Sequence, residues 1–552
     1  MKWYRALALS IVSGLLLAFS WYPHGLPFLI FFAWIPLLLI SSSILEEQKK
    51  HPFLKGWLLS WPGFLVWNLI TTYWIGYCTL EGAIGAIVAN SLLQAWVFGF
   101  WQCCRSYIKQ EWAHPILLIS LWMSFEYLHL NWDLTWPWLN LGNVFATCPH
   151  WVQWYSITGA FGGTLWIFIL NFIFYYLLRY QRRTGQRAWK HAFAFLSVLL
   201  VPAIISAILF KHNERTIDQT QAVDVVVVQP NTDPWTEEYE LTNTQQMERI
   251  LRVSTPLINE NTRLVVCPES SIPHSVSIQN MKANSYPLGN SSYNGFLLLD
   301  SLFTQYPKLN FILGLSTFEY YNHAATETAQ PFGPNNFIDV YNTAVCYNAN
   351  KYNGHYHKCR LVPGVEKMPF PKVFGFLGDI LIQLGGSNTS LGNDTCQRTF
   401  LIQQGPRPIR IGTAICYESI YGELFGKFVQ NGANVMTVIT NDSWWKDSQG
   451  HKQHFEMSRL RAVETHRYVL RAANGGFSGI ISPTGDVLQK TKYNERTALK
   501  ATIYAQQGET FYVKHGDYLA KIALILSLIG CLYALFIWFK RILIRKKQTI
   551  RY

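Results

Sequence analysis

Charged residues are scarce in this sequence. Asp, Glu, Lys and Arg together make up 14% of the 552 residues, whereas about a quarter of a typical soluble protein is charged. Acidic residues are the scarcer kind, 33 against 46 basic residues, and most of them fall between about 217 and 510. This composition excludes an ordinary soluble enzyme and predicts a membrane-embedded part that carries a soluble part.

Motifs for nucleic acids, metals and repeats are also missing. The net charge of +13 could suggest a polyanionic partner, but no motif that reads nucleic acid accompanies it. No CxxC motif and no Cys/His spacing typical of a zinc site occurs. We therefore expect no nucleic-acid partner, no metal and no other cofactor. The chain shows no internal repeat and no low-complexity tract.

Long apolar segments, by contrast, are abundant. A helix that spans a bilayer needs about 20 apolar residues, and eight segments of roughly this length occur at 5–21, 26–44, 56–77, 82–104, 114–130, 163–178, 190–210 and 518–539. They predict a polytopic membrane domain with seven transmembrane helices in residues 1–210 and an eighth helix, with a basic tail, in 518–552. A cleavable signal peptide is the alternative for the first segment, but no small-x-small cleavage site closes it.

Basic residues alternate between the loops that join these segments. The loops near 22–25, 78–81 and 131–162 contain no Lys or Arg. The basic positions of the other loops and the termini are Lys2, Arg5, Lys49, Lys50, Lys55, Arg105, Lys109, Arg179, Arg182, Arg183, Arg187, Lys190, Lys540, Arg541, Arg545, Lys546, Lys547 and Arg551. Because basic loops stay in the cytoplasm, we expect both termini to be cytoplasmic and residues 211–517 to lie outside the cytoplasm.

The loop at 131–162 is rich in tryptophan, with Trp132, Trp136, Trp138 and Trp151 among its residues. Tryptophan favours the headgroup region of a membrane, so an aromatic belt is the default interpretation. A lipid-facing floor beneath the soluble domain is the alternative.

The region 211–517 alternates β-rich and helix-forming stretches. Segments rich in Val and Ile predict strands at 223–229, 263–267, 310–317, 341–347, 409–416, 435–440 and 476–482. Polar–apolar stretches of helix length lie at 243–258, 419–431 and 454–467. The pattern predicts a single α/β domain.

Six of the ten cysteines are expected outside the cytoplasm, where disulfides are permitted: Cys148, Cys267, Cys346, Cys359, Cys396 and Cys416. An even count allows three bridges. Cys416 differs from the others because it ends a predicted strand and Tyr417-Glu418-Ser419 then opens a predicted helix. A thiol at a helix N-terminus is expected to have a lowered pKa, which suits a nucleophile. A buried or disulfide-bonded cysteine is the alternative.

Two further segments carry chemistry that would complement a thiol. Val265-Val-Cys-Pro-Glu269 ends a strand in a carboxylate, and Tyr356-His-Lys358-Cys-Arg places a lysine before an extended stretch. Taken alone, Glu269 would be a helix cap or a surface salt bridge, and Lys358 a solvated side chain. Together with Cys416 they complete an arrangement of nucleophile, base and cation.

These segments resemble the nitrilase superfamily, which performs acyl transfer through a thioester with a Glu–Lys–Cys triad. With the eight apolar segments, nearly the whole chain is similar to the apolipoprotein N-acyltransferase family. The resemblance implies an αββα sandwich for residues 211–517. It also implies that Glu269 is the general base, Lys358 the oxyanion-stabilising lysine and Cys416 the nucleophile.

Other positions match the family as well. The resemblance implies supporting or substrate-binding roles for Glu366, Glu418, Tyr417, Trp235, Trp444 and Asn441. Tyr417 would supply a backbone N–H to the oxyanion, and Trp235 would lie near the acyl donor. Two departures occur: Cys267 stands where the family often has tryptophan, and Pro363-Gly-Val-Glu366 replaces Pro-Phe-Gly-Glu. Cys267 is therefore expected to affect donor preference, and Cys359 is a rival nucleophile.

The family's reaction moves a fatty acyl group from a glycerophospholipid, through the cysteine thioester, to the α-amino group of an S-diacylglyceryl cysteine in an apolipoprotein. The resemblance thus implies an enzyme with ping-pong kinetics in the bacterial inner membrane, multi-pass, with its catalytic domain on the periplasmic side. Its partners would be the phospholipid donor, the apolipoprotein acceptor and membrane lipid, and a monomer is expected.

Three other classes compete with this interpretation. A membrane-bound nitrilase-type amidase or hydrolase would pass the acyl group to water, and the triad cannot separate it from a transferase. Transporters usually carry charged residues within their membrane segments. Such residues are few in this sequence, and Glu126 is the main candidate. A non-catalytic binding module would not need the triad. The segment Phe370–Leu377, with 380–384, is either a loop that gates the site or an ordinary packed loop.

Overall fold

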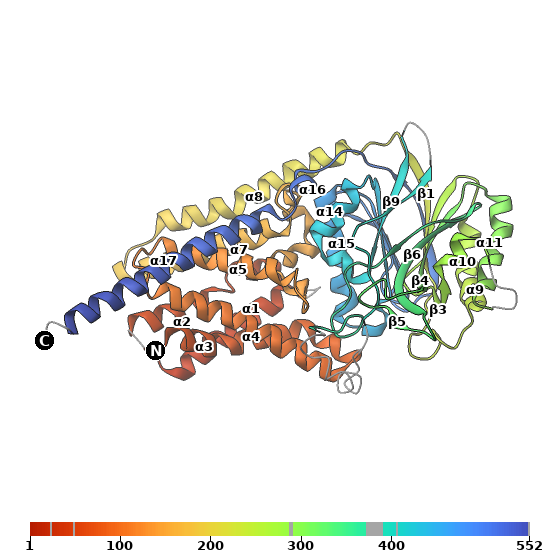
Figure 1. Cartoon of the computed structure of the whole chain (residues 1–552). Helices are drawn as coiled ribbons and strands as arrows, with labels where there is room; N and C mark the ends of the chain where they lie inside the picture. Colours follow the sequence, from red (N-terminus) through yellow and green to blue (C-terminus); the bar gives the residue numbers. More distant parts are fainter. Residues whose placement is uncertain (22–24, 48–49, 286–290, 371–389, 404–406, 550–552) are drawn as a thin grey trace. The chain divides into compact units, whose positions relative to one another are not determined.

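The computed structural model describes residues 1–21, 25–47, 50–285, 291–370, 390–403 and 407–549. Within this part the chain divides into two compact units (Figure 1). The first consists of Met1–Gly76, Ala83–Ala207 and Asp517–Tyr552, and the second of Tyr77–Gly82 and Ile208–Gly516. Apart from Phe370, the segments considered for gating lie outside the described residues.

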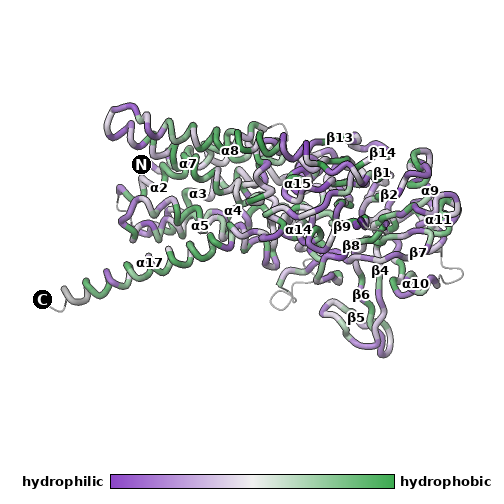
Figure 2. The backbone as a smooth tube through the Cα atoms, turned by 90° about the horizontal axis from the view of Figure 1, so that it is seen from above, coloured by the Kyte–Doolittle hydropathy of each residue, from purple (hydrophilic) through white to green (hydrophobic). Residues whose placement is uncertain are grey.

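Helices follow all eight predicted apolar segments. They are α1 (Trp3–Trp21), the short 3-10 helix η1 (Pro27–Phe31) continued by α2 (Ile35–Glu46), α3 (Pro52–Thr72), α4 (Leu80–Arg105), α5 (Ala113–His129), α7 (Ala160–Thr184), α8 (Trp189–Arg215) and α17 (Tyr518–Thr549). In Figure 2 hydrophobic residues dominate α8 and α17 over most of their length. The first unit is therefore a bundle of mainly apolar helices.

Six of these helices are long and apolar enough to cross a membrane: α1, η1 with α2, α4, α7, α8 and α17. The third and fifth predicted spans are helical but are not among the six. Helix α5 has 17 residues, and at about 1.5 Å per residue it is about 25 Å long, shorter than the hydrocarbon core. Helix α3 contains Lys55, Pro62 and Asn68, which lower its hydropathy.

Glu126 of α5 is held inside the helical unit. Its carboxylate accepts hydrogen bonds from Trp122 Nε1 at 3.0 Å, from the backbone N–H of Leu141 at 2.7 Å and from the Thr164 hydroxyl at 2.9 Å. A buried carboxylate with all these donors ties three segments of the unit together. The carboxylate of Glu126 therefore has a structural role inside the first unit.

The tryptophan-rich loop at 131–162 packs largely inside the first unit. Trp138 and Tyr155 are buried, and the Tyr155 hydroxyl donates to the carbonyl of Gly142 at 2.8 Å. Trp151, in contrast, is exposed. The ring of Trp138 packs on Trp74 and Trp136, and the aromatic belt stays a prediction.

The second unit contains an eight-stranded sheet and a six-stranded sheet. The eight-stranded sheet runs β14-β1-β2-β4-β6-β5, with β3 paired to β4 and β7 paired to β6. Its strands are β1 (Ala222–Gln229), β2 (Thr262–Val266), β3 (Ile272–Ser277), β4 (Asn310–Tyr321), β5 (Gln330–Pro331), β6 (Phe337–Asn348), β7 (Lys351–His357) and β14 (Thr497–Tyr504).

The six-stranded sheet runs β13-β12-β11-β10-β9-β8. Its strands are β8 (Thr399–Gln403), β9 (Ile409–Ile415), β10 (Val435–Thr440), β11 (Val469–Ala473), β12 (Gly479–Ile481) and β13 (Val487–Lys490). Strands β9, β10 and β11 are parallel neighbours. Their carboxyl ends therefore meet at one edge of this sheet, which is where a parallel sheet usually places a site.

Helices cover the outer faces of the two sheets (Figure 1). On one side are α9 (Asn243–Ser254), α10 (Ile278–Lys282) and α11 (Asn294–Gln305), and on the other α14 (Gly422–Gln430) and α15 (Gln449–Thr465). Met247, Phe296 and Tyr347 belong to the hydrophobic cluster beneath the first group. The predicted α/β domain is thus confirmed as two sheets between two helical layers.

Candidate active site

Cys416 lies at a sharp turn between a strand and a short helix. Strand β9 ends at Ile415, and the 3-10 helix η9 (Cys416–Ile420) begins at Cys416 itself. The backbone of Cys416 has φ +50°, a left-handed conformation that is uncommon for a residue with a Cβ atom. Such strain is characteristic of functional positions because the surrounding structure must maintain it.

The thiol of Cys416 is not a preformed thiolate. Burial raises its pKa well above the ordinary value, the charge of Glu269 raises it further, and the charge of Lys358 opposes both. The expectation of a pKa lowered by a helix N-terminus is therefore wrong. Helix η9 has five residues, too few peptide dipoles to offset burial beside a carboxylate.

Glu269 follows β2 in a tight turn whose position depends on Gly314 of β4. The backbone N–H of Gly314 donates to the carbonyl of Pro268 at 3.2 Å, and a Cβ atom on Gly314 would lie 2.6 Å from Glu269 Cα. Only glycine permits this approach. The Glu269 carboxylate is buried and accepts hydrogen bonds from Asn342 Nδ2 at 2.7 Å and the Asn441 N–H at 3.0 Å.

Lys358, the residue after β7, bridges two carboxylates. Its Nζ atom lies 3.2 Å from Glu269 Oε1 and 2.9 Å from Glu366 Oε1. Asn342 Nδ2 also reaches both carboxylates, at 2.7 Å from Glu269 and 3.0 Å from Glu366. Lys358 is 1% exposed. Burial opposes its charge, but the charges of Glu269, Glu366 and Cys416 outweigh burial, so the pKa of Lys358 is well above its ordinary value.

Glu418 connects the segment of Cys416 with the segment of Lys358. One carboxylate oxygen accepts the backbone N–H of Ile415 at 2.8 Å. The other accepts the Tyr356 hydroxyl at 2.6 Å and the backbone N–H of Cys359 at 2.7 Å. Burial raises the pKa of Glu418. The structure thus gives this residue a positioning role, with Tyr356 and Cys359 on one side and the strand before Cys416 on the other.

Asn441 lies between Glu269 and a further acid, Glu238. Its Nδ2 atom donates to Glu238 Oε2 at 2.8 Å, while its backbone N–H binds Glu269. Burial raises the pKa of Glu238 to about 7, the charge of Glu269 adds to this, and the hydrogen bond from Asn441 opposes it. Glu238 is therefore a carboxyl group that can hold a proton near neutral pH.

The carbonyl of Cys416 is held by a buried polar network. His454 Nε2 lies 3.2 Å from this carbonyl oxygen, and His454 Nδ1 lies 2.9 Å from Asp442 Oδ1. Arg471 donates to Asp442 Oδ2 at 2.5 Å. Burial opposes ionisation of Asp442, but Arg471 and His454 reverse this and hold its pKa well below the usual range.

Trp235 and Trp444 meet edge to face, with ring centroids 4.8 Å apart. Trp235 is 53% exposed. Trp235 lines an open pocket of about 450 Å³, to which Ser443 also contributes. The rest of its lining consists of Asn231, Thr232, Asp233, Pro234, Thr236, Glu237, Lys446, Gly475, Tyr493, Asn494 and Arg496. Trp235 is therefore the member of the pair that is open to a ligand.

Two other cysteines, Cys267 and Cys359, were expected to matter for the site, and they lie in different surroundings. Cys267 is fully buried in the hydrophobic cluster beneath α9 and α11, and its influence on donor preference stays a prediction. Burial raises the pKa of Cys359, and Gln397 donates to its sulfur at 3.3 Å. All ten cysteines are described, and none forms a disulfide.

The structure brings Glu269, Lys358, Glu366 and Asn441 into direct hydrogen-bonded contact and couples Cys416 to Glu269 and Lys358 by charge. Trp235 and Trp444 form a separate pair. Sequence reasoning did not single out Asn342 or Glu238. Asn342 stands inside an apolar strand, which is a signal in itself, whereas Glu238 follows a proline-containing loop and carries no such signal.

Comparisons with known proteins agree with this architecture. Residues 224–511 match the family model for carbon-nitrogen hydrolases, and residues 13–173 match that for the apolipoprotein N-acyltransferase N-terminal domain. The second unit is therefore a carbon-nitrogen hydrolase domain. With both domains present, the chain belongs to the apolipoprotein N-acyltransferase family.

Individual relatives extend over nearly the full length. The apolipoprotein N-acyltransferase of Chlorobaculum tepidum is 26% identical, and the match covers 94% of each chain. That of Methylococcus capsulatus is also 26% identical, with 96% of each chain covered. Among solved structures, Saccharomyces cerevisiae Nit3 of the nitrilase superfamily is similar at 18% identity and a TM-score of 0.35, covering 52% of this chain and 93% of Nit3.

Proposed function

We propose that the protein transfers a fatty acyl group from a glycerophospholipid, through a thioester on Cys416, to the α-amino group of an S-diacylglyceryl cysteine in apolipoproteins. Family membership supports lipoprotein N-acylation. The observation that carries the assignment of residues is the buried pair of Glu269 and Lys358, 3.2 Å apart, whose charges both act on the Cys416 thiol.

The first half-reaction forms the thioester. Glu269 accepts the thiol proton as the sulfur of Cys416 attacks the ester carbonyl of the phospholipid. The Lys358 ammonium and the backbone N–H of Tyr417 stabilise the tetrahedral oxyanion, and losing one such donor costs about 2.7–4 kcal/mol. The C–O bond then breaks, Glu269 returns its proton to the departing alkoxide, and a lysophospholipid leaves.

The second half-reaction consumes the thioester. The acceptor amine attacks the thioester carbonyl, and Glu269 takes a proton from the amine as the amide forms. The C–S bond breaks and the proton returns to the sulfur of Cys416. Because the first product leaves before the acceptor reacts, this order predicts ping-pong kinetics.

Supporting residues have separate tasks in this proposal. Glu366 shares Lys358 with Glu269 and so keeps the lysine protonated and placed. Glu418 fixes the strand before Cys416 to the segment that follows Lys358. Asn441 orients Glu269 through its backbone N–H. Trp235, paired with Trp444, would hold substrate at its open face.

The membrane arrangement belongs to the same proposal. Both substrates keep acyl chains in a bilayer, so a reaction between them needs a membrane-embedded enzyme. We propose that all eight apolar helices span the inner membrane of a bacterium, with residues 211–517 on the periplasmic side and both termini in the cytoplasm. The distribution of Lys and Arg among the loops supports this orientation. A monomer suffices, since one chain carries all proposed site residues.

Mass spectrometry of a synthetic diacylglyceryl-cysteine peptide, incubated with phospholipid and the purified full-length protein, tests the function. The wild type should add one acyl chain to the peptide amine, and Cys416→Ala should add none. Cys359→Ala is the matched control and should retain activity. Release of free fatty acid by the wild type, with the peptide unchanged, would instead establish a hydrolase. Activity in Cys416→Ala would exclude Cys416 as the nucleophile.

A further inference from the structure

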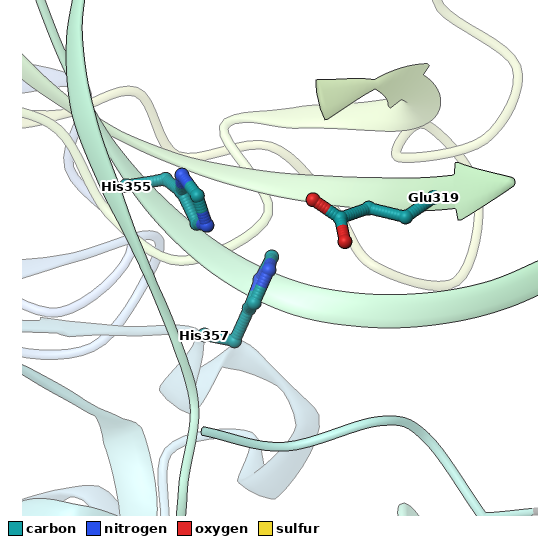
Figure 3. Close-up of side chains that lie close together, drawn as sticks. All are labelled: Glu319, His355 and His357. Carbon is teal, nitrogen blue, oxygen red and sulfur yellow. The ribbon is translucent and has the colours of Figure 1, made fainter. Parts of the chain in front are cut away.

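Glu319, His355 and His357 converge outside the site described above (Figure 3). One potential ligand atom from each residue lies within 4.8 Å of the other two. Glu319 stands near the end of β4, and both histidines stand on β7. The three side chains therefore come from two strands of one sheet and point into a common space.

The register of the sheet explains the convergence. Strand β6 lies between β4 and β7, with Asp339 opposite Glu319 and Thr343 opposite His357. Residues directly opposite each other in antiparallel strands share a face, and residues two apart on a strand do as well. Glu319, His355 and His357 are thus fixed on one face by backbone pairing.

Hydrogen bonds orient both imidazole rings. His357 Nδ1 lies 2.8 Å from the Thr343 hydroxyl, and His355 Nδ1 bonds the Tyr352 hydroxyl. Among the described residues, the Nε2 atoms of both rings have no hydrogen-bond partner. Both rings are buried, at 7% and 5% exposure. A histidine metal ligand characteristically has its other ring nitrogen engaged in this way, which fixes the ring and its tautomer.

The carboxylate of Glu319 already holds a cation. Its Oε1 atom lies 3.1 Å from Lys282 Nζ, and its Oε2 atom accepts the Tyr321 hydroxyl at 2.7 Å. Lys282 ends the short helix α10, and its side chain is 46% exposed. The ammonium group can turn into solvent and release Oε1, so that another cation can take its place.

We propose that Glu319, His355 and His357 form a binding site for a divalent transition-metal ion of the zinc class. Two imidazoles and one carboxylate suit Zn²⁺, which binds such ligands at about 2.0–2.2 Å and completes its tetrahedron with water. Ligand atoms around such an ion are about 3.4 Å apart. The three ligand atoms here lie within 4.8 Å of one another. Rotation about the side-chain bonds of Glu319 can bring its carboxylate closer to the two histidines.

The ion would have a structural role. Along β7 successive side chains alternate in direction, so His355 and His357 point to the face opposite Tyr356 and Lys358. Tyr356 contacts Glu418, and Lys358 contacts Glu269. An ion on the histidine face would therefore tie β7 to β4 and stabilise the strand that precedes Lys358, without contact to the reacting groups.

The expectation of no metal considered only spacing along the chain. His355 and His357 are two residues apart, but Glu319 precedes them by more than thirty positions and joins them only through β6. A Cys/His spacing search cannot detect such a site, because strand pairing assembles it.

Zinc binding to the full-length protein in detergent tests this proposal, independently of acyl transfer. After chelator treatment, equilibrium dialysis against ZnCl₂ with elemental analysis should show one ion per wild-type chain that is lost from His355→Asn and His357→Asn. The affinity for zinc should fall about 100-fold in these variants, because losing a ligand costs more than losing an outer-shell partner. Zinc should raise the unfolding temperature of the wild type but not of these two histidine variants.

Three further variants make the result decisive even if a histidine variant does not fold. Glu319→Gln replaces a half-buried group and should weaken zinc binding at least about tenfold. Lys282→Met removes the competing ammonium and should tighten binding. His323→Ala changes an exposed histidine near the end of β4 and should bind zinc as the wild type does. Equal zinc binding in Glu319→Gln and the wild type, or no zinc bound by the wild type, would overturn the proposal.

Discussion

At the scale of single residues, the surroundings of Cys416 raise the pKa of its thiol. Burial raises this pKa most, the charge of Glu269 raises it further, and the charge of Lys358 lowers it. The carboxylate disfavours a thiolate in the resting site but can accept its proton during reaction. Lys358, in turn, balances Glu269 and Glu366 and is available to a developing oxyanion. The same lysine thus has a structural and a proposed chemical task.

Replacing Lys358 separates these two tasks. Lys358→Met leaves Glu269 and Glu366 buried without their cation, so we expect it to destabilise the protein by about 3–5 kcal/mol. Lys358→Met with Glu366→Gln removes one of the two unpaired charges and should recover part of that loss. Acyl transfer should stay absent in both, because the ammonium group is gone. Thermal unfolding in detergent and detection of the acyl-enzyme by mass spectrometry measure the two effects.

Thioester formation by the double variant would contradict this assignment. It would show that the ammonium of Lys358 only balances charge. Glu366→Gln alone is the matched control, since it keeps the lysine paired with Glu269.

Glu238 makes stability depend on pH. Its pKa is raised from 4.5 to about 7, so the folded protein favours the neutral acid. The stabilisation is complete below pH 4.5 and is lost as pH rises through about 7. Glu238→Gln should therefore stabilise the protein at pH 8, by at most about 3 kcal/mol, and have little effect at pH 4.5. Unfolding temperatures across this range measure the difference.

The neighbouring Glu237 is the control for this prediction. The hydrogen bond and charge of Arg249 lower the pKa of Glu237 to about 2 despite partial burial. Its stabilisation is present above the unfolded pKa of 4.5 and lost as pH falls. Glu237→Gln should thus destabilise slightly at pH 8, by about 0–1 kcal/mol. The same sign for both variants at pH 8 would contradict the account of Glu238.

At the scale of secondary structure, the approach of β4 to the Glu269 turn sets the position of the base. An alanine at Gly314 would place its Cβ 2.4 Å from the carbonyl oxygen of Pro268. We expect Gly314→Ala to displace Glu269 and to reduce acyl transfer about 100-fold, as a shift of about 1 Å at a reacting group does. The stability cost should be about 1–3 kcal/mol. Steady-state rates with thermal unfolding measure both.

Gly426→Ala provides the comparison, because a Cβ there meets only Val513 at 3.7 Å or more. Gly426 lies inside α14, where alanine is the better helix former by up to about 1 kcal/mol. Full activity with equal or higher stability is expected. If Gly314→Ala also keeps full activity, the close approach of β4 does not position Glu269.

The strands with a simple pattern could be predicted from the sequence. The runs at 223–229, 310–317 and 435–440 are largely apolar and correspond to β1, β4 and β10. Strand β11, Val469–Ala473, was missed because Arg471 interrupts its apolar run. Only in three dimensions does Arg471 meet Asp442, which neutralises its charge inside the core. Strand β7 was missed for a similar reason, since Tyr, Asn and His fill it.

The candidate site was predictable to the extent that its residues adjoin strand ends. Glu269, Lys358 and Cys416 were singled out from such positions and from family resemblance. Asn342 and Glu238 were not, because their importance follows from contacts with Glu269 and Asn441 that distant pairing creates. The pKa of Cys416 was predicted with the wrong sign, because burial is not visible in a linear sequence.

At the scale of the whole molecule, the distribution of charge argues for the proposed orientation. Seven apolar helices precede residue 211, and an odd number of crossings would place the following domain on the side opposite the N-terminus. Basic residues stand on alternate loops and in the C-terminal tail. Since the positive-inside rule assigns such loops to the cytoplasm, the domain is expected outside. If only one of α3 and α5 did not cross, the parity would change and this expectation would fail.

Cys396 makes the orientation measurable with the natural chain. It is the one exposed cysteine among the ten, all of which are described, and it belongs to the second unit. A maleimide that cannot cross membranes should label Cys396 in spheroplasts without permeabilisation, and Cys396→Ser should lose the label. In that background, Lys540→Cys, at an exposed position of α17, should react only after the membrane is opened. Labelling of Lys540→Cys in intact spheroplasts, or of Cys396 only after permeabilisation, would reverse the orientation. Either result would then place the candidate site on the cytoplasmic side, where its acceptor would have to be presented instead.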